Sequence, residues 1–382
     1  MKKINFKLIL LSLFISVISL PLAEKAFHFS VSKLAELKGA YIKPVCPQLS
    51  WKSFFNSELQ DSLSAYIESK ISNRNALVRL RNQLSFTLFH ESENTDLVVG
   101  KNNYLFELPY IDSYNSSGGI DSGWIFNQTD MLADIVDTLK SKNIDLLVVF
   151  APSKVSFMPE NVPVKYLRMS KHDALYQTCA DALLRNSIPF IDFNSYYKSI
   201  KTTAEYPVFF KGNAHWSFYT GCEAMDSIAR YMQTQFNIPL FSYTLVIPNS
   251  TPIPQFQDND LSSTLNLLNP FADSGFIYPY FVKEDTTKCN RPDVLFVGDS
   301  FGWTLIFSQF PQNFFNKNFK FWDYNRTVWS EYYEKARPIE NYDYKAELLK
   351  NRLIILIDGG LSYNNIGNGF INSAYKIFHP DK

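Results

Sequence analysis

Cysteine, histidine and net charge are all scarce in this sequence. The 382 residues include four cysteines and five histidines, and 37 basic residues balance 37 acidic ones. The sequence has no Cys-x-x-Cys pair and no cluster of histidine with cysteine, so it gives no indication of a zinc site. With zero net charge, no overall field recruits nucleic acid. We therefore expect no metal, no cofactor and no nucleic-acid partner.

The N-terminus has the pattern of an export segment. Lys2, Lys3 and Lys7 flank an uncharged run over residues 8–23, and a basic flank followed by an apolar run is typical of such signals. The run is short for a membrane span, which needs ~20 residues, whereas residues 21–23 form a poor cleavage site. Residues 1–27 are thus either a signal anchor, which we favour, or a signal peptide. In both cases the basic residues stay inside, so we expect the rest of the chain to be periplasmic or otherwise extracytoplasmic. As a signal anchor, the segment would also attach it to the inner membrane.

An extracytoplasmic location would allow the cysteines to form disulfides. Cys46, Cys179, Cys222 and Cys289 would lie in an oxidising compartment, where disulfides form. Four cysteines allow three pairings. The sequence does not choose among them.

The remainder of the chain divides into a helical lead-in, residues 28–90, and a larger domain, residues 91–382. Apolar residues recur at helical spacing in the lead-in, and a hairpin-like pattern follows over 98–106. From about residue 126 helices and strands alternate, which predicts an α/β domain with a mainly parallel sheet. The expected helices are 130–142, 173–185 and 217–235, and the expected strands are 144–150, 188–193, 206–210, 244–247, 293–297, 319–322 and 353–357.

A serine follows the apolar strand predicted at 293–297. Gly298-Asp299-Ser300 leads directly into an apolar segment with helical spacing. A residue at such a turn lies at the carboxyl edge of the sheet, where open α/β proteins bind ligands. The first N–H groups of the next helix are unpaired there and can stabilise an oxyanion. Ser300 is either a nucleophile or simply a helix N-cap, and Asp299 is expected to brace the turn.

A histidine is predicted at the same edge. His215 lies in the segment 211–216, between a short expected strand and a long expected helix. With five histidines in the chain, the base for a serine nucleophile must come from a small set. A single histidine in a loop also has a structural interpretation, and this stays open.

The order of several motifs resembles one family. The segments 100–106, 148–154, 213–216 and 298–301, with Asp260-Leu261 before the last, resemble alginate O-acetyltransferases of the AlgJ and AlgX type over roughly residues 45–365. The resemblance implies an SGNH-hydrolase-like three-layer α/β/α fold. It also implies an extracytoplasmic enzyme that acetylates a secreted polysaccharide. The acetyl groups would come from an integral-membrane acyltransferase of the MBOAT type.

The resemblance assigns roles to particular residues. Ser300 matches the family nucleophile and His215 its general base, and an acetyl-serine intermediate is implied. Asn213 stands where the family has an aspartate that orients the imidazole. In a serine-protease template that exchange costs about 10⁴ in turnover. Asn213 is expected to orient His215 if its side-chain carbonyl accepts from the ring N–H. Trp216 and Trp303 are candidate sugar platforms, with core packing as the alternative.

Asn103 is a candidate for a further oxyanion donor in this scheme.

Three other interpretations remain. Gly298-Asp299-Ser300-Phe301-Gly302 also matches the nucleophile elbow of α/β-hydrolases, with Asp358 and His379 as partners. An SGNH acetylesterase would use the same Ser300 and His215. A non-catalytic polysaccharide-binding or assembly subunit is suggested by Asn213.

Overall fold

A computed structural model provides the coordinates of the chain. The structure describes residues 6–27, 35–39, 44–48, 53, 55, 57–71, 73–116, 119–167, 172–271, 273–284, 291–361 and 363–380. The chain forms two compact units. Unit 1 is Met1–Glu93 with Ser263–Phe271, and unit 2 is Asn94–Ser262 with Ala272–Lys382.

Unit 2 is built on a central sheet. Within the described residues seven strands pair in the order β10-β9-β8-β7-β11-β3-β4. These are β3 (Asp145–Phe150), β4 (Phe190–Asp192), β7 (Val294–Gly298), β8 (Lys320–Asp323), β9 (Thr327–Trp329), β10 (Arg337–Pro338) and β11 (Leu353–Asp358). The five strands from β8 to β4 are parallel, and β9 and β10 extend the edge in antiparallel fashion. The predicted mainly parallel α/β sheet is thus confirmed.

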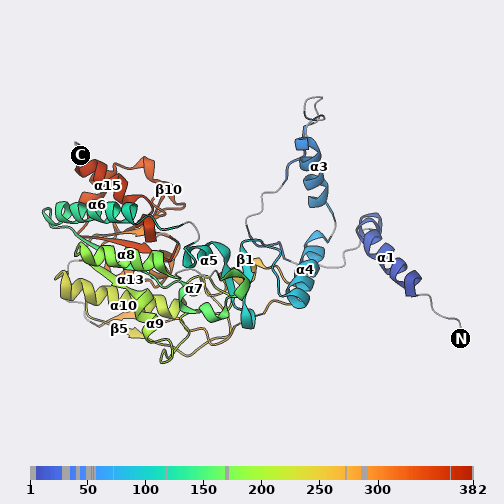
Figure 1. Cartoon of the computed structure of the whole chain (residues 1–382), viewed down its shortest axis with the longest axis horizontal. Coiled ribbons are helices and arrows are strands. Elements are labelled where there is room, and N and C mark those ends of the chain that lie inside the picture. The colour runs from blue at the N-terminus through green and yellow to red at the C-terminus, as the bar shows by residue number, and fades with distance from the viewer. Residues whose placement is uncertain are drawn as a thin grey trace. The chain divides into compact units, whose positions relative to one another are not determined.

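Helices cover both faces of this sheet, as Figure 1 shows for the larger unit. Alternate residues of β3, β7 and β11 point to opposite faces, because side chains of a strand alternate with a period of two. Leu147, Phe296 and Ile355 pack in one apolar cluster, and Val148 and Leu356 in the other. The first cluster includes residues of α10 (Phe218–Gln235), α12 (Gly302–Phe307) and α13 (Phe310–Phe314), and the second those of α6 (Ser122–Lys140), α8 (Ala174–Arg185) and α15 (Phe370–Phe378). The result is the expected three-layer α/β/α arrangement.

The smaller elements of unit 2 fill the edges. Strands β1 (Leu97–Val99) and β2 (Leu105–Glu107) form the predicted hairpin. Strand β5 (Tyr243–Val246), expected from the sequence, pairs with β6 (Tyr280–Lys283) in a separate two-stranded sheet. The remaining helices are α5 (Leu108–Tyr114), α7 (Lys154–Phe157), α9 (Phe193–Ser199), α11 (Asp260–Thr264) and α14 (Tyr344–Leu349).

The strand expected at 206–210 is wrong. The segment contains Pro207, which has no N–H to donate to a strand ladder, and it forms bends and loop. The N–H of Phe210 bonds to the side chain of Asn213, and the carbonyl of Val208 accepts from Ser217. These bonds close a turn before α10 in place of a strand.

Unit 1 contains α1 (Phe6–Phe27), α3 (Ser57–Ser69), α4 (Arg74–Leu84) and a π-helical turn, Ser85–Phe89. Asn82 and Phe86 contact the returning segment 263–271, through the carbonyl of Leu265 and the ring of Phe271. Lys2 and Lys3 of the expected export segment lie outside the described residues. Of the helices in the described part of the chain, none combines the length and the apolarity that a membrane span requires.

The thiols of Cys46, Cys179 and Cys222 are free, and Cys289 lies outside the described residues.

Candidate active site

Ser300 lies in the turn between β7 and α12, at the carboxyl edge of the sheet. Gly298, the last residue of β7, makes this turn possible, because a Cβ there would lie 2.2 Å from the backbone oxygen of Ile357 on β11. The side chain of Asp299 closes the turn, as expected. Its oxygens accept from the N–H groups of Phe301 (3.0 Å) and Gly359 (2.7 Å).

His215 meets Ser300 at this edge. The Nε2 atom of His215 lies 2.7 Å from the Oγ of Ser300, although 85 positions separate the residues in the chain. The loop 211–216 brings the imidazole there, directly before α10 begins at Phe218. The two groups that the sequence placed at one edge are therefore within hydrogen-bonding distance.

The imidazole is oriented by Asp260, which the sequence analysis named as part of a motif but did not assign to this role. Asp260 is the first residue of α11, and its Oδ2 lies 2.5 Å from the Nδ1 of His215. Its Oδ1 accepts from the backbone N–H groups of Ala214 (2.9 Å) and Leu261 (2.8 Å). The carboxylate is thus fixed by two backbone donors on one oxygen and faces the imidazole with the other.

Asn213 does not orient His215, which corrects the expectation from the sequence. Its side chain is fully buried, and its Oδ1 accepts from the N–H of Phe210 at 3.1 Å. Its Nδ2 has no hydrogen-bond partner among the described residues. Asn213 therefore stabilises the turn that precedes His215, and Asp260 occupies the orienting position.

The electrostatics of the site raise the pKa of His215. Burial by itself lowers the pKa of His215, but the hydrogen bond and the charge of Asp260 outweigh it, so the pKa lies above its ordinary value. Burial raises the pKa of Asp299 to about 6. Burial likewise raises the pKa of Glu107, at the end of β2, a carboxyl that senses the charge of His215.

Tyr324 is a second residue that the sequence analysis missed. It follows β8, and its hydroxyl lies 3.3 Å from the Oγ of Ser300. Its backbone N–H bonds to the carbonyl of Gly298 at 2.7 Å, which holds it beside the turn. Gln257 donates to the backbone carbonyl of Ser300 at 3.3 Å. No sequence motif predicts a role for Tyr324 or Gln257, because both lie in loops that only the folded structure brings next to Ser300.

The remaining candidates lie elsewhere. Trp216 is fully buried and packs against Phe193 and Phe301, so it is a core residue and not a sugar platform. Trp303 is partly buried in an aromatic cluster with Trp329, and its role as a platform stays a prediction. Asn103 lies in the turn between β1 and β2, and its role as an oxyanion donor is likewise a prediction.

The α/β-hydrolase arrangement is not formed. The Nε2 of His379 lies 3.3 Å from the Oγ1 of Thr138 on α6, and the carboxylate of Asp358 accepts from the N–H of Gly367. Neither His379 nor Asp358 bonds to Ser300. Among the described residues, His215 is the only histidine that contacts the hydroxyl of Ser300.

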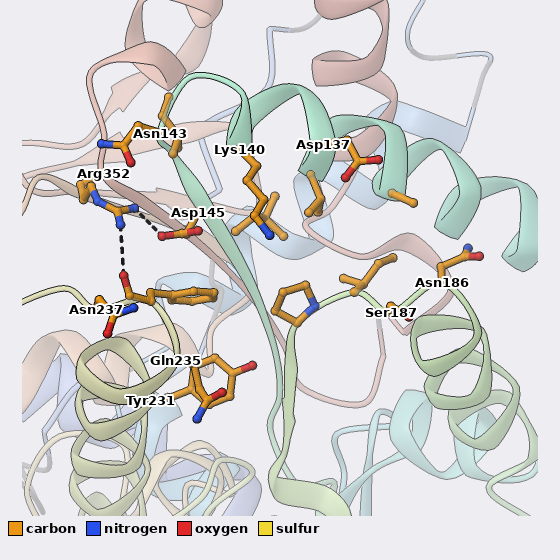
Figure 2. Close-up of a pocket in the computed structure, with 17 residues that line it drawn as sticks. Asp137, Lys140, Asn143, Asp145, Asn186, Ser187, Tyr231, Gln235, Asn237 and Arg352 are labelled. Atoms are coloured by element: carbon orange, nitrogen blue, oxygen red, sulfur yellow. Dashed lines mark hydrogen bonds and ion pairs between the residues drawn. The ribbon is translucent and has the colours of Figure 1, made fainter.

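A cavity of about 690 Å³ lies at the opposite edge of the sheet and is drawn in Figure 2. Arg352 and Asp145, at the amino ends of β11 and β3, form an ion pair on its wall, and Arg352 also donates to the carbonyl of Phe236. Ligands of parallel α/β sheets bind at the carboxyl ends of the strands. This cavity is therefore separate from the candidate active site.

Comparisons with known proteins agree with this architecture. Residues 97–250 match the family described as SGNH hydrolase-like domain, acetyltransferase AlgX. The solved O-acetyltransferase domain of Pseudomonas putida AlgJ is 16% identical, with a TM-score of 0.51 over 74% of this chain and 99% of that chain.

Two further solved structures are more distant. AlgX of Pseudomonas aeruginosa is 14% identical, with a TM-score of 0.45 over 72% of this chain and 67% of that chain. PatB1 of Bacillus cereus is 12% identical, with a TM-score of 0.42 over 64% of this chain and 91% of that chain. A search of curated protein sequences found no match.

The likeness to AlgJ concerns the fold, and the family match covers residues that include His215. Together they confirm the resemblance predicted from the sequence. Over residues 97–250 this chain is therefore similar to the SGNH hydrolase-like domains of the AlgX acetyltransferase type.

Proposed function

We propose that the protein is an O-acetyltransferase that transfers acetyl groups to hydroxyls of a secreted polysaccharide through an acetyl-Ser300 intermediate. The observation that carries the proposal is the chain of hydrogen bonds from Ser300 through His215 to Asp260, with distances of 2.7 and 2.5 Å. Nucleophile, base and orienting acid in this geometry are the arrangement that acyl transfer by serine requires.

The first half of the reaction acylates the serine. His215 takes the proton of the Ser300 hydroxyl on Nε2 while Oγ attacks the acetyl carbonyl of the donor. Asp260 keeps the other ring proton on Nδ1 and stabilises the imidazolium that forms. The tetrahedral intermediate then collapses, the bond to the donor's leaving oxygen breaks, and His215 returns its proton to that oxygen.

The oxyanion needs donors aimed at the position where charge develops. The hydroxyl of Tyr324 lies next to Ser300 Oγ and also interacts with the backbone N–H of Ser300. We assign Tyr324 and this N–H to the oxyanion site. In the second half of the reaction a sugar hydroxyl attacks acetyl-Ser300 with His215 again as base.

The partners and the location belong to the same proposal. A polysaccharide is the acceptor, and an integral-membrane acyltransferase of the MBOAT type supplies the acetyl group. The basic residues and apolar run at the N-terminus support an extracytoplasmic, periplasmic location. An SGNH acetylesterase would use the same three residues with water as acceptor, so the fate of the acetyl group decides between the two.

The experiment uses the full-length protein with a small acetyl ester, with and without an oligosaccharide. Mass analysis should find one acetyl group on the peptide that contains Ser300, and Ser300→Ala should abolish it. With the acceptor present, acetate should appear as sugar ester. Release of free acetate alone, unaffected by acceptor, would favour the esterase, and glycan binding without any adduct would favour the non-catalytic interpretation.

A further inference from the structure

The loop that carries His215 has no regular structure of its own. Residues 211–216 form turns and bends. Three contacts hold its first two residues, and each comes from a different segment: the N–H of Leu105 to the carbonyl of Lys211 (2.9 Å), the N–H of Ser262 to the carbonyl of Gly212 (3.0 Å), and the N–H of Gly212 to Asp273 (3.1 Å). The position of the imidazole therefore depends on tertiary contacts of the loop.

Lys154 supplies a fourth contact from inside the domain. It is the first residue of α7, directly after the loop that follows β3, and only 4% of it is exposed. Its Nζ donates to the carbonyl of Lys211 at 3.0 Å and to the carbonyl of Asn213 at 2.5 Å. One amine thus binds two carbonyls of the loop, the second of them two residues before His215.

Two aromatic rings are the other contacts of the Lys154 amine. No carboxylate lies within ion-pair distance of its Nζ in the described part of the chain. The amine lies 5.6 Å from the ring centre of Tyr104 and 5.5 Å from that of Phe106. Burying an ammonium group is unfavourable unless hydrogen bonds compensate for the lost water. Compared with an apolar residue of the same length, this lysine adds two hydrogen bonds to the loop and cation–π contacts with the two rings. Of these, only the hydrogen bonds bind the loop that carries His215.

We propose that Lys154 is a positioning residue for the reaction at Ser300. Its amine draws two carbonyls of the loop together and so fixes His215 against the nucleophile. This inference rests on the proposed function for its kinetic consequence, whereas the position of the imidazole can be measured without any reaction.

The bond between Lys154 and the loop is expected to depend on pH. Burial lowers the pKa of Lys154 to about 7, against the opposing influence of nearby carboxylates. A charged donor makes hydrogen bonds roughly twice as strong as a neutral one, so the loop is held more firmly below this pH than above it. The charged and titratable groups that face the amine or its loop are Glu107 at the end of β2, Asp260 of α11, Asp273, Tyr104, Lys211 and His215.

The test compares Lys154→Met, which keeps the length and removes the donors, with Lys154→Arg, which keeps a charge that does not titrate. The rate constant for acylation of Ser300 by a small acetyl ester is measured against pH in the full-length protein. Lys154→Met should lower this rate constant about 10²-fold, the effect of displacing a catalytic group by about 1 Å. Lys154→Arg should retain more activity and lose the decline above pH 7 that is expected for the wild type.

Two controls separate positioning from folding. Lys198→Met removes a half-buried lysine of α9 that pairs with Asp173 at 2.5 Å, and it should leave the pH profile unchanged. Lys154→Gln keeps an uncharged donor with two N–H groups. Lys154→Gln replaces Lys154→Met in the comparison with the wild type if Lys154→Met fails to fold. Its acylation rate constant should also show no decline above pH 7.

A second readout does not depend on activity. The proton between Nδ1 of His215 and Asp260 should give a low-field NMR signal in the wild type, and this signal should shift or broaden in Lys154→Met. An unchanged signal together with an unchanged acylation rate and pH profile would overturn the inference. If the wild type shows the signal but never acylates Ser300, the proposed function fails, and the NMR comparison alone decides the role of Lys154.

Discussion

Replacing Asp260 by asparagine should nearly abolish acylation of Ser300 while the fold is retained. The Oδ1 of Asp260 accepts from two backbone N–H groups, those of Ala214 and Leu261. An asparagine must place its carbonyl oxygen there, because its amide nitrogen cannot accept these bonds. Its NH₂ group then faces Nδ1 of His215 and donates to it.

This reversal fixes the wrong tautomer of the imidazole. When Nδ1 accepts, the ring proton moves to Nε2, and Nε2 can no longer take the proton of Ser300. The same exchange in the serine-protease template lowers turnover about 10⁴-fold. That factor corresponds to about 5 kcal/mol of lost transition-state stabilisation.

The assay is the single-turnover rate of Ser300 acylation by an activated acetyl ester, followed by mass. Asp258→Asn is the matched control, because Asp258 is two residues away, 1% exposed, and bonds to the N–H of Phe218 and not to His215. It should leave the rate nearly unchanged. A rate for Asp260→Asn within a few-fold of the wild type would refute the assignment of Asp260 as the orienting acid.

Three further predictions follow from the same geometry. Asn213→Ala should lower the free energy of unfolding, measured by urea titration, by about 1–3 kcal/mol, because it leaves the buried N–H of Phe210 without its acceptor. Acylation of Ser300 should persist at urea concentrations below the unfolding transition. Loss of acylation in folded protein would contradict the structural role of Asn213. Tyr324→Phe should reduce the acylation rate about 10²- to 10³-fold with the fold unchanged, the effect of losing one oxyanion donor; an unchanged rate would remove Tyr324 from the oxyanion site. His215 acts as a base only when neutral, and its pKa lies above its ordinary value, so the acylation rate should rise with pH through that raised pKa. Asp260→Ala should shift this rise to lower pH. A rise at unchanged pH would show that Asp260 does not set the pKa of His215.

The sequence predicted the parallel part of the sheet because buried parallel strands are continuous apolar runs. Strands β3, β7 and β11 lie where such runs occur and are almost fully buried. Strands β9, β10 and β6 were missed because each is short and partly exposed, and β10 contains Pro338. The order of strands, with β11 between β3 and β7, is a property of packing that no single run of residues reveals.

The site was predicted in part for the same reason. Ser300 and His215 each follow or precede a recognisable element, so their edge of the sheet was predictable. Asp260 lies 45 residues after His215 in a region without periodicity, and only the fold brings it to the imidazole. Asn213 was predicted as the orienting residue because it stands where the family has an aspartate, but its side chain accepts from the N–H of Phe210 instead.

The most direct test of the account is to identify the residue that carries the acetyl group. Full-length protein is treated with an isotope-labelled acetyl ester, quenched rapidly and digested, and the labelled peptide is sequenced by mass spectrometry. We predict the label on Ser300, with its formation strongly slowed in His215→Ala. A label on another residue, or acetyl transfer that proceeds unchanged in Ser300→Ala, would contradict the account.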